Sequence, residues 1–323
     1  MPKVSVLMAS YNHERYIEEA VASILAQSFK DFELIVVDDA SPDNSVEALR
    51  KIRDPRLKLI QHEQNKGVCV TFNDAFAASS GEYIALIGSD DRWHPKKLTT
   101  QTEFLDQHPD ILAVFSTVRK IDAHGNVLES GGRCDFPQDV DRWKVLRGIF
   151  AKLNYLNAPS EMLRRSAIEA DPQFYDPRFV QLQDMEQHVR LALRGEIFVM
   201  PYPFVDYRWH GENLSKGSAA AHARNDLEYA LLMDSLLQIE NPAMVKRIIP
   251  NSKLDTTDVR LVPFVLAHRA LEADNLFQRH WGYTVIGNYI KDPALASYLA
   301  ETVGFAPTDF YQLYGQVIRR GMP

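Results

Sequence analysis

The sequence predicts an α/β protein with a doubly wound, mostly parallel open sheet and a helical C-terminal appendage. Two observations predict the sheet: apolar runs of strand length recur through residues 3–118, and segments with helical periodicity separate them. A third predicts the appendage, because strand signals fade towards the C-terminus while long helical patterns continue. We therefore expect a domain over residues 1–217, with halves 1–118 and 119–217, and a helical region over 218–323.

The expected strands of the first half are hydrophobic along their whole length, which is typical of strands covered on both faces of a parallel sheet. They are Val4–Ala9, Phe32–Val37, Leu57–Gln61, Tyr83–Ile87 and Ile111–Phe115. Helices are expected between them over Glu14–Gln27, Asp43–Ile52, Val68–Ser79 and Pro95–Gln107. Ser41 and Pro42 support the second helix as an N-cap and a first-turn proline.

Beyond residue 118 the alternation weakens. The pattern predicts a turn over Asp122–Asn126, helices over Asp139–Phe150 and Asp184–Arg194, and strands over Ser160–Leu163, Ile197–Met200 and Val205–Tyr207. Two long helices are expected in the C-terminal region, over Ala219–Ile239 and Val259–Leu276.

The composition narrows the class of protein. Of 323 residues, 46% are hydrophobic and 24% are charged, as in ordinary globular proteins, and the formal net charge of −7 argues against nucleic-acid binding through a large basic face. Cys69 and Cys134 have no CxxC spacing, so neither a disulfide framework nor a zinc site is indicated. The N-terminal apolar run is too short for a signal peptide and no run reaches 18 apolar residues. We expect a cytoplasmic protein, at most peripheral to a membrane.

Polar side chains gather where the expected strands end, which is where open α/β sheets bind ligands. They are Ser10, Tyr11, Asn12, Asp38, Asp39, Ser41, Asn65, Lys66, Gly67, Asp90 and Asp91. Helix caps and turns account for Ser41 and Asn65 by themselves. Two Asp-Asp pairs at strand ends call for another explanation.

The glycine loops that commonly bind phosphates are absent from these positions. ASYNHE follows the first strand where a dehydrogenase would need GxGxxG, and the chain has no GxxxxGK[ST]. A divalent cation held by carboxylates would then have to neutralise any bound diphosphate, and Mg²⁺ or Mn²⁺ prefers such oxygen ligands. The same cation would offset the repulsion between Asp90 and Asp91.

Several spaced segments resemble the family 2 inverting glycosyltransferases, which have the GT-A fold. These segments are VSVLMASYNHERYIEEAVASILAQSFKDFELIVVDDASPDNS, NKGV, GEYIALIGSDDRWHPKKL and QDMEQHVRLAL, and the resemblance covers roughly residues 3–215. It implies a nucleotide site made by Ser10, Tyr11, Asn12, Asp39, Asn65, Gly67 and Asp90. In it Tyr11 stacks on the base, Asp39 accepts a hydrogen bond from a base N–H and Asp90 contacts ribose or sugar. Asp91 would bind the metal, although the roles of Asp90 and Asp91 stay open because Gly88 replaces the first acid of the common DxDD motif.

The second half of the resemblance supplies the chemistry. Asp184 matches the carboxylate that acts as general base, while Gln183 replaces the acid that usually precedes it. YRWHGENLS resembles the segment that closes over the diphosphate, so His210 is expected to bind metal or phosphate. Further phosphate or acceptor contacts are expected from Arg208, Lys216, Trp93 and Gln183, and Trp93 fits a core position equally well.

The implied activity is inverting, Mn²⁺- or Mg²⁺-dependent transfer of a sugar from a nucleotide diphosphate sugar, with UDP-sugars first, to an acceptor hydroxyl in bacterial surface glycan synthesis. The acceptor would be a lipid-linked glycan, a polysaccharide precursor or a protein. The C-terminal helices would contact a membrane, a partner or a second copy. Two alternatives remain: a nucleotidyltransferase, which usually carries a basic glycine-rich loop after the first strand, and a catalytically silent nucleotide-sugar-binding module, which Gln183 and Gly88 would permit.

Overall fold

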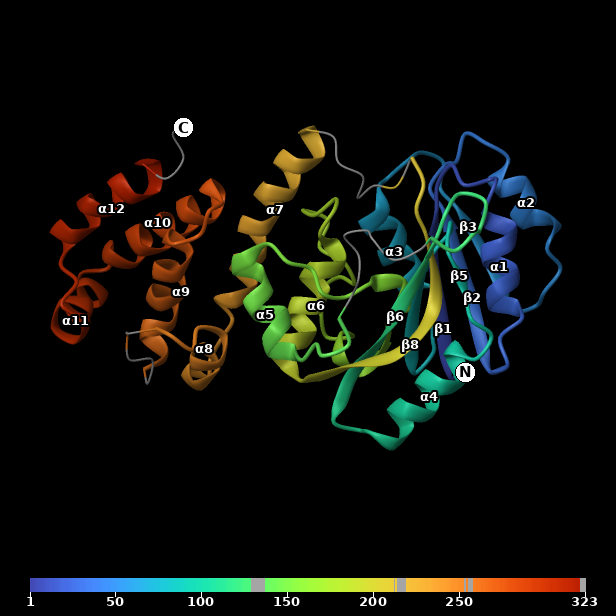
Figure 1. Cartoon of the computed structure of the whole chain (residues 1–323), viewed down its shortest axis with the longest axis horizontal. Coiled ribbons are helices and arrows are strands. Elements are labelled where there is room, and N and C mark those ends of the chain that lie inside the picture. The colour runs from blue at the N-terminus through green and yellow to red at the C-terminus, as the bar shows by residue number, and fades with distance from the viewer. Residues whose placement is uncertain (129–136, 212, 214–218, 253, 255–257, 320–323) are drawn as a thin grey trace. The chain divides into compact units, whose positions relative to one another are not determined.

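The protein is described by a computed structural model that covers residues 1–128, 137–211, 213, 219–252, 254 and 258–319. It divides into two compact units (Figure 1). The first comprises Met1–Arg142 with Tyr155–Lys216, and the second comprises Trp143–Asn154 with Gly217–Pro323. Among the helices of the described ranges, none combines the length and apolar character that a bilayer span requires.

The described strands of the first unit form one sheet of eight, in the order β3-β2-β1-β4-β7-β6-β8-β5. Pairing is parallel for β1 with β2 and β4, for β2 with β3, and for β6 with β8, whereas β7 and β5 run the opposite way. The predicted α/β fold with a mostly parallel sheet is therefore confirmed. The strands are β1 (Val4–Ser10), β2 (Phe32–Asp38), β3 (Leu57–Gln61), β4 (Tyr83–Gly88), β5 (Arg92–Trp93), β6 (Ile111–Ile121), β7 (Met162–Arg164) and β8 (Glu196–Arg208).

Both faces of the central strands are buried, which is why their hydrophobicity is continuous. On one face, Val6 of β1 and Leu34 of β2 lie in a core cluster with Ile17 of α1. The alternate side chains Leu7 and Ile35 are buried on the other face, where α3 packs against β1 and β2. The helices of this unit are α1 (Ile17–Leu25), α2 (Ser45–Lys51), α3 (Val68–Ala77), α4 (Lys97–Gln107) and α6 (Gln183–Arg194), with the short 3₁₀ turns η1 (Ala158–Ser160) and η2 (Arg165–Ala167).

The second half of this sheet differs from the expectation in two places. The strand predicted over Ile111–Phe115 continues to Ile121. The two strands predicted over Ile197–Met200 and Val205–Tyr207 are one strand, β8, whose register with β6 shifts beside Pro203. Prolines lack the N–H that a ladder needs, and the irregular register lets the strand continue past them.

The second unit is helical in its described part, as predicted. Its elements are α5 (Arg142–Ala151), α7 (Ala219–Leu236), α8 (Pro242–Ile248), η3 (Val259–Leu261), α9 (Val262–Leu271), α10 (Leu276–Ile290), α11 (Pro293–Val303) and α12 (Pro307–Arg319). The single helix predicted over Val259–Leu276 is wrong, because the chain turns after Leu271 and starts α10 with Asn275 as its N-cap. Buried Arg279 closes this turn by donating to the carbonyls of Ala273 and Asp274.

Candidate active site

A cluster of two histidines and one aspartate lies just beyond the ends of three strands that run in the same direction. His13 follows β1, Asp90 follows β4 and His210 follows β8. One ligand atom from each lies within 4.8 Å of the other two. His210 Nε2 is 3.0 Å from Asp90 Oδ2, and the ring of Tyr16 lies 5.1 Å from the His210 ring. The carboxyl edge of the sheet thus brings together residues that are far apart in the sequence.

This cluster has the chemistry of a divalent metal site. A mixed set of imidazole nitrogen and carboxylate oxygen suits transition dications, including Mn²⁺. Burial opposes ionisation of Asp90, but the hydrogen bond with His210 and the charges of His13 and His210 outweigh it and lower the pKa of Asp90. Its carboxylate is therefore ready to bind a cation. His13 also contacts Ser89 Oγ through Nδ1 at 2.7 Å, the kind of outer contact that orients metal-binding histidines.

Asp91 is not a member of the cluster that its neighbour joins. It is 2% exposed, and its Oδ1 accepts a hydrogen bond from the backbone N–H of Arg208 at 2.8 Å. Burial and the adjacent charge of Asp90 raise the pKa of Asp91 well above the usual value. The resemblance implied Asp91 as the metal ligand. In the structure the two histidines that could share a metal ion lie beside Asp90 instead.

Gly88 makes room for this arrangement. A Cβ at this position would lie 2.7 Å from Asp90 Oδ1, closer than Cβ atoms approach other atoms, and 3.0 Å from Asp91 Oδ2, a tight contact. A third acid at position 88 would therefore require the Asp90 carboxylate to move. The departure from the DxDD motif is matched to the conformation of this turn.

Asp184 is the second residue of α6 and is half-buried. Its Oδ1 accepts a hydrogen bond from the N–H of Met185 at 2.7 Å. Burial is the largest influence on Asp184 and raises its pKa. A carboxylate with a raised pKa at a helix N-terminus suits a group that takes up a proton. The neighbouring Gln183 has its Oε1 buried without a hydrogen-bond partner among the described residues.

Residues 5–152 match the family model described as Glycosyl transferase family 2. This part of the chain is a family 2 glycosyltransferase domain. The uncharacterized glycosyltransferase MJ1057 of Methanocaldococcus jannaschii is 32% identical over 193 residues, which are 58% of this chain and 64% of that protein. The UDP-Glc:alpha-D-GlcNAc-diphosphoundecaprenol beta-1,3-glucosyltransferase WfaP of Escherichia coli is 36% identical over 106 residues, 33% of this chain and 42% of WfaP. The chain thus spans less than two thirds of the length of these relatives.

The fold is also found in the crystal structure of S. aureus TarS 1-349 in complex with UDP-GlcNAc. The two structures superpose with a TM-score of 0.63 over 98% of this chain and 89% of that chain, at 20% sequence identity. The likeness extends the GT-A type of architecture beyond the residues matched by the family model.

Two residues expected to contact the ligand serve the framework of the first unit instead. The guanidinium of Arg208 is buried, donates to the carbonyls of Asp90 and Asp122 and pairs with Glu19, so it is committed to joining β8 to the end of β4. Trp93 is buried and donates through Nε1 to the carbonyl of Pro159, which places it in the core rather than on the acceptor side. Lys216 lies outside the described residues.

On the nucleotide side, the loop after β1 presents Tyr11 most openly. The Tyr11 side chain is 46% exposed, as a residue that stacks on a base must be. Ser10 is buried and donates to Asp38 Oδ2, so its hydroxyl already has a partner. Asn12 adopts a left-handed conformation with φ 57°, which asparagine tolerates, and its N–H donates to Ser41 Oγ.

Asp39 organises the loop between β3 and α3. Its carboxylate accepts from the N–H groups of Lys66 and Gly67, each at 2.8 Å, and contacts His62 Nδ1 at 2.7 Å. Gly67 starts α3 with φ 86°, a conformation that glycine adopts without strain, and Asn65 is exposed beside it. Asp39 therefore has strong internal partners, and a carboxylate's further lone pairs remain for a base N–H.

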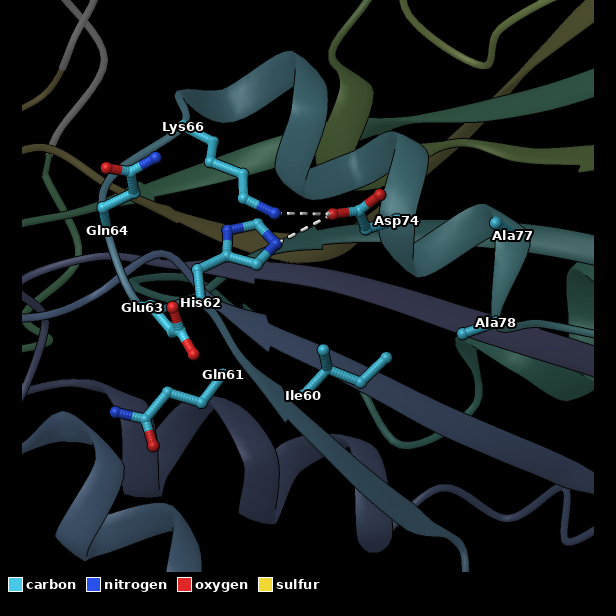
Figure 2. A pocket seen from close by; sticks show the side chains of 9 residues that line it. All are labelled: Ile60, Gln61, His62, Glu63, Gln64, Lys66, Asp74, Ala77 and Ala78. Atoms are coloured by element: carbon cyan, nitrogen blue, oxygen red, sulfur yellow. Dashed lines mark hydrogen bonds and ion pairs between the residues drawn. The ribbon is translucent and has the colours of Figure 1, made fainter.

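A hollow of about 810 Å³ lies beside this loop. Figure 2 shows His62 and Lys66 on its wall, both directed at the carboxylate of Asp74. His62 thus links Asp39 in the nucleotide loop to Asp74 on α3. The hollow is lined by Ile60, Gln61, His62, Glu63, Gln64, Lys66, Asp74, Ala77 and Ala78. None of these belongs to the cluster of His13, Asp90 and His210, which we call the metal-type cluster.

Sequence reasoning did not single out His13 as a ligand. It stands in the same loop as Tyr11 and Asn12, three residues past β1, and a histidine at a strand end was the available signal. Glu161 and His188, which lie close to Asp184, were also missed.

Proposed function

We propose that the family 2 domain is an inverting glycosyltransferase that moves a sugar from a nucleotide diphosphate sugar to an acceptor hydroxyl. The observation that carries the proposal is the metal-type cluster of His13, Asp90 and His210 at the carboxyl edge of the sheet. α6 packs against β8 and leads into it through Gly195, so its first turn, with Asp184, points back towards the same edge. This arrangement supports a diphosphate–metal site and a base on one side of the sheet.

In the proposed reaction the acceptor oxygen attacks the anomeric carbon from the side opposite the leaving group. The bond between that carbon and the phosphate oxygen breaks, and the nucleoside diphosphate leaves with the bonding electrons. Asp184 takes the proton from the acceptor hydroxyl. Because the displacement is a single step from the opposite face, it inverts the configuration without a covalent sugar intermediate. A correctly placed base contributes about 10²–10⁴ to such a rate.

His13, Asp90 and His210 would hold the divalent cation, and their two imidazole nitrogens favour Mn²⁺ over Mg²⁺, which prefers oxygen ligands. When bound, the cation offsets the negative charge that develops on the departing diphosphate. Tyr11 would stack on the base and Asp39 would accept from its N–H, with Asn12, Asn65 and Gly67 forming the surrounding backbone. Asp91, held by Arg208, would support the turn that carries Asp90.

A UDP-sugar is the first choice of donor, because WfaP is named for UDP-Glc and TarS was crystallised with UDP-GlcNAc. The name of WfaP also gives a sugar on diphosphoundecaprenol as its acceptor. A lipid-linked saccharide of surface glycan synthesis is therefore the acceptor class that we propose for this protein.

The test is a screen of UDP-, GDP- and dTDP-sugars for thermal stabilisation of the full chain, with Mn²⁺ and with EDTA, followed by transfer to a polyprenyl diphosphate sugar. We expect one nucleotide to stabilise the protein only with the cation, and its sugar to be transferred with inversion. Equal, cation-independent stabilisation by every nucleotide would contradict the proposed site. Binding of a nucleotide sugar without turnover over a wide acceptor panel would favour a silent binding module.

A further inference from the structure

A buried carboxylate–imidazole pair, Glu161 and His188, lies close to Asp184. Glu161 is 0% exposed and His188 is 1% exposed, with Glu161 Oε2 3.6 Å from His188 Nε2. Neither the carboxylate oxygens of Glu161 nor the ring nitrogens of His188 have a hydrogen-bond partner among the described residues. Leaving buried polar groups without hydrogen-bond partners is unfavourable for folding. Such a pair is therefore a poor choice for stability alone.

The backbone around Glu161 is held firmly in place by the segment that follows Asp91. Three side chains of this segment donate to three successive carbonyls: Trp93 to Pro159, Gln101 to Ser160 and Lys97 to Glu161, at 3.0, 2.9 and 3.1 Å. Trp93, Lys97 and Gln101 are all buried. The backbone of Glu161 is thus held in place, although its carboxylate oxygens make no hydrogen bond within the described part of the chain.

His188 occupies the position between Glu161 and the first turn of α6. It follows Asp184 by four residues, so the two side chains lie on the same side of the helix, one turn apart. The ring of Phe115, from β6, packs edge-on against the imidazole with centroids 5.0 Å apart. The imidazole thus lies 3.6 Å from the carboxylate of Glu161 and one helical turn from Asp184.

We propose that Glu161 and His188 are positioning residues for Asp184, with His188 stabilising the ionised base and Glu161 orienting His188. This inference rests on the proposed function for the role of Asp184 in transfer, but the electrostatic coupling itself does not. His188 acts to lower the pKa of Asp184, whereas Glu161 acts to raise it, in addition to the larger effect of burial. The two residues therefore act on the base in opposite senses.

The other titratable groups around this site are accounted for. Burial raises the pKa of Tyr175, and the charges of Glu161 and Asp184 raise it further. Lys97 lies beside Glu161, and its burial lowers its pKa well below the usual value for a lysine, although the charge of Glu161 opposes this shift. Further along α6, Glu186 pairs with Arg190, which also pairs with Asp171. These last three form an ion-pair network of their own, and it provides a matched control.

The test is a ¹³C NMR titration of the Asp184 carboxyl carbon in the full chain, assigned with Asp184→Asn. We expect Glu161→Gln to lower the Asp184 midpoint and His188→Gln to raise it, each by about one pH unit. Glu186→Gln, which removes a buried carboxylate from the same helix, should leave the midpoint unchanged. No shift, or shifts of the same sign in both variants, would overturn the inference.

Two further readouts cover failure to fold and failure of the proposed function. If either variant does not fold, the ¹⁵N titration of His188 is measured instead, in the unmodified protein and in Asp184→Asn. Identical His188 midpoints in these two proteins would overturn the inference. If the protein transfers sugar, the acidic limb of kcat/KM should move with the NMR midpoint while the donor KM stays constant. A raised donor KM with an unmoved limb would overturn it and place Glu161 against the sugar. Opposite NMR shifts in a protein without transfer activity would support the coupling and remove only the role of Asp184 as a base.

Discussion

The nucleotide loop should lose its order when the carboxylate of Asp39 is removed. Asp39 accepts from the N–H groups of Lys66 and Gly67, both at 2.8 Å. Lys66 is exposed and Gly67 is partly exposed, so water can replace the carboxylate as their partner. Each charge-assisted bond then contributes only its net value, at the low end of about 1.5–3 kcal/mol. Asp39→Ala should therefore make opening of this loop easier by about 3 kcal/mol.

Hydrogen exchange measured by mass spectrometry on the full chain reads this quantity directly. A change of about 3 kcal/mol corresponds to exchange on the order of 100-fold faster for the amides of residues 66 and 67. The matched control is Asp74→Ala, which removes the carboxylate on the other side of His62. Asp74 is 43% exposed, so its pair with His62 is worth less than about 1 kcal/mol and exchange should quicken less than about fivefold.

The comparison of the two variants decides whether Asp39 organises the loop. Equal effects of Asp39→Ala and Asp74→Ala, or unchanged protection of the two amides in Asp39→Ala, would refute the reasoning. Loss of nucleotide binding in Asp39→Ala without faster exchange would instead limit Asp39 to a ligand contact.

Four further outcomes are expected. Asp184→Asn should lower transfer by about 10²–10⁴ with nucleotide affinity nearly intact, and steady-state kinetics with calorimetry separates the two effects. Because burial raises the pKa of Asp184 and only its ionised form accepts a proton, kcat/KM should fall as the pH drops through a midpoint above about 3.9; a midpoint at or below that value would contradict the raised pKa. Arg208→Lys should lower the free energy of unfolding in urea titrations by about 2–4 kcal/mol, because the carbonyls of Asp90 and Asp122 lose the guanidinium that donates to them. Unchanged stability together with weaker phosphate binding would show that Arg208 contacts the ligand. Gly88→Asp should weaken Mn²⁺ binding, because its Cβ would displace the Asp90 carboxylate, and equal affinity by calorimetry would argue against that geometry.

The sheet could be predicted from the sequence because its evidence is local. Continuous apolar runs and the helical spacing between them depend on neighbours a few residues apart, and the strands Val4–Ser10 and Phe32–Asp38 extend the predicted ones by a single residue. The break after Leu271 was missed although Asn275, a good N-cap, stood in the predicted helix.

The site was harder to predict because its decisive contacts are not local. Asp90 and Asp91 are identical in type and adjacent, and only the approach of the Arg208 N–H, 117 residues away, distinguishes them. Glu161 and His188 meet because α6 packs near β6 and η1, which no spacing in the sequence encodes. The sequence shows a histidine at position 13, but its proximity to His210 depends on the order of the strands in the sheet.

The most direct test of the account is a Mn²⁺ titration followed by the EPR signal of the free ion, in the presence of UDP. The full chain should bind one equivalent of Mn²⁺, and Asp90→Asn, His13→Ala and His210→Ala should each weaken binding at least about tenfold. His108→Ala is the matched control, since His108 is exposed and stands at the end of α4, outside the cluster. Undiminished binding in Asp90→Asn together with its loss in Asp91→Asn would contradict the assignment of the metal site.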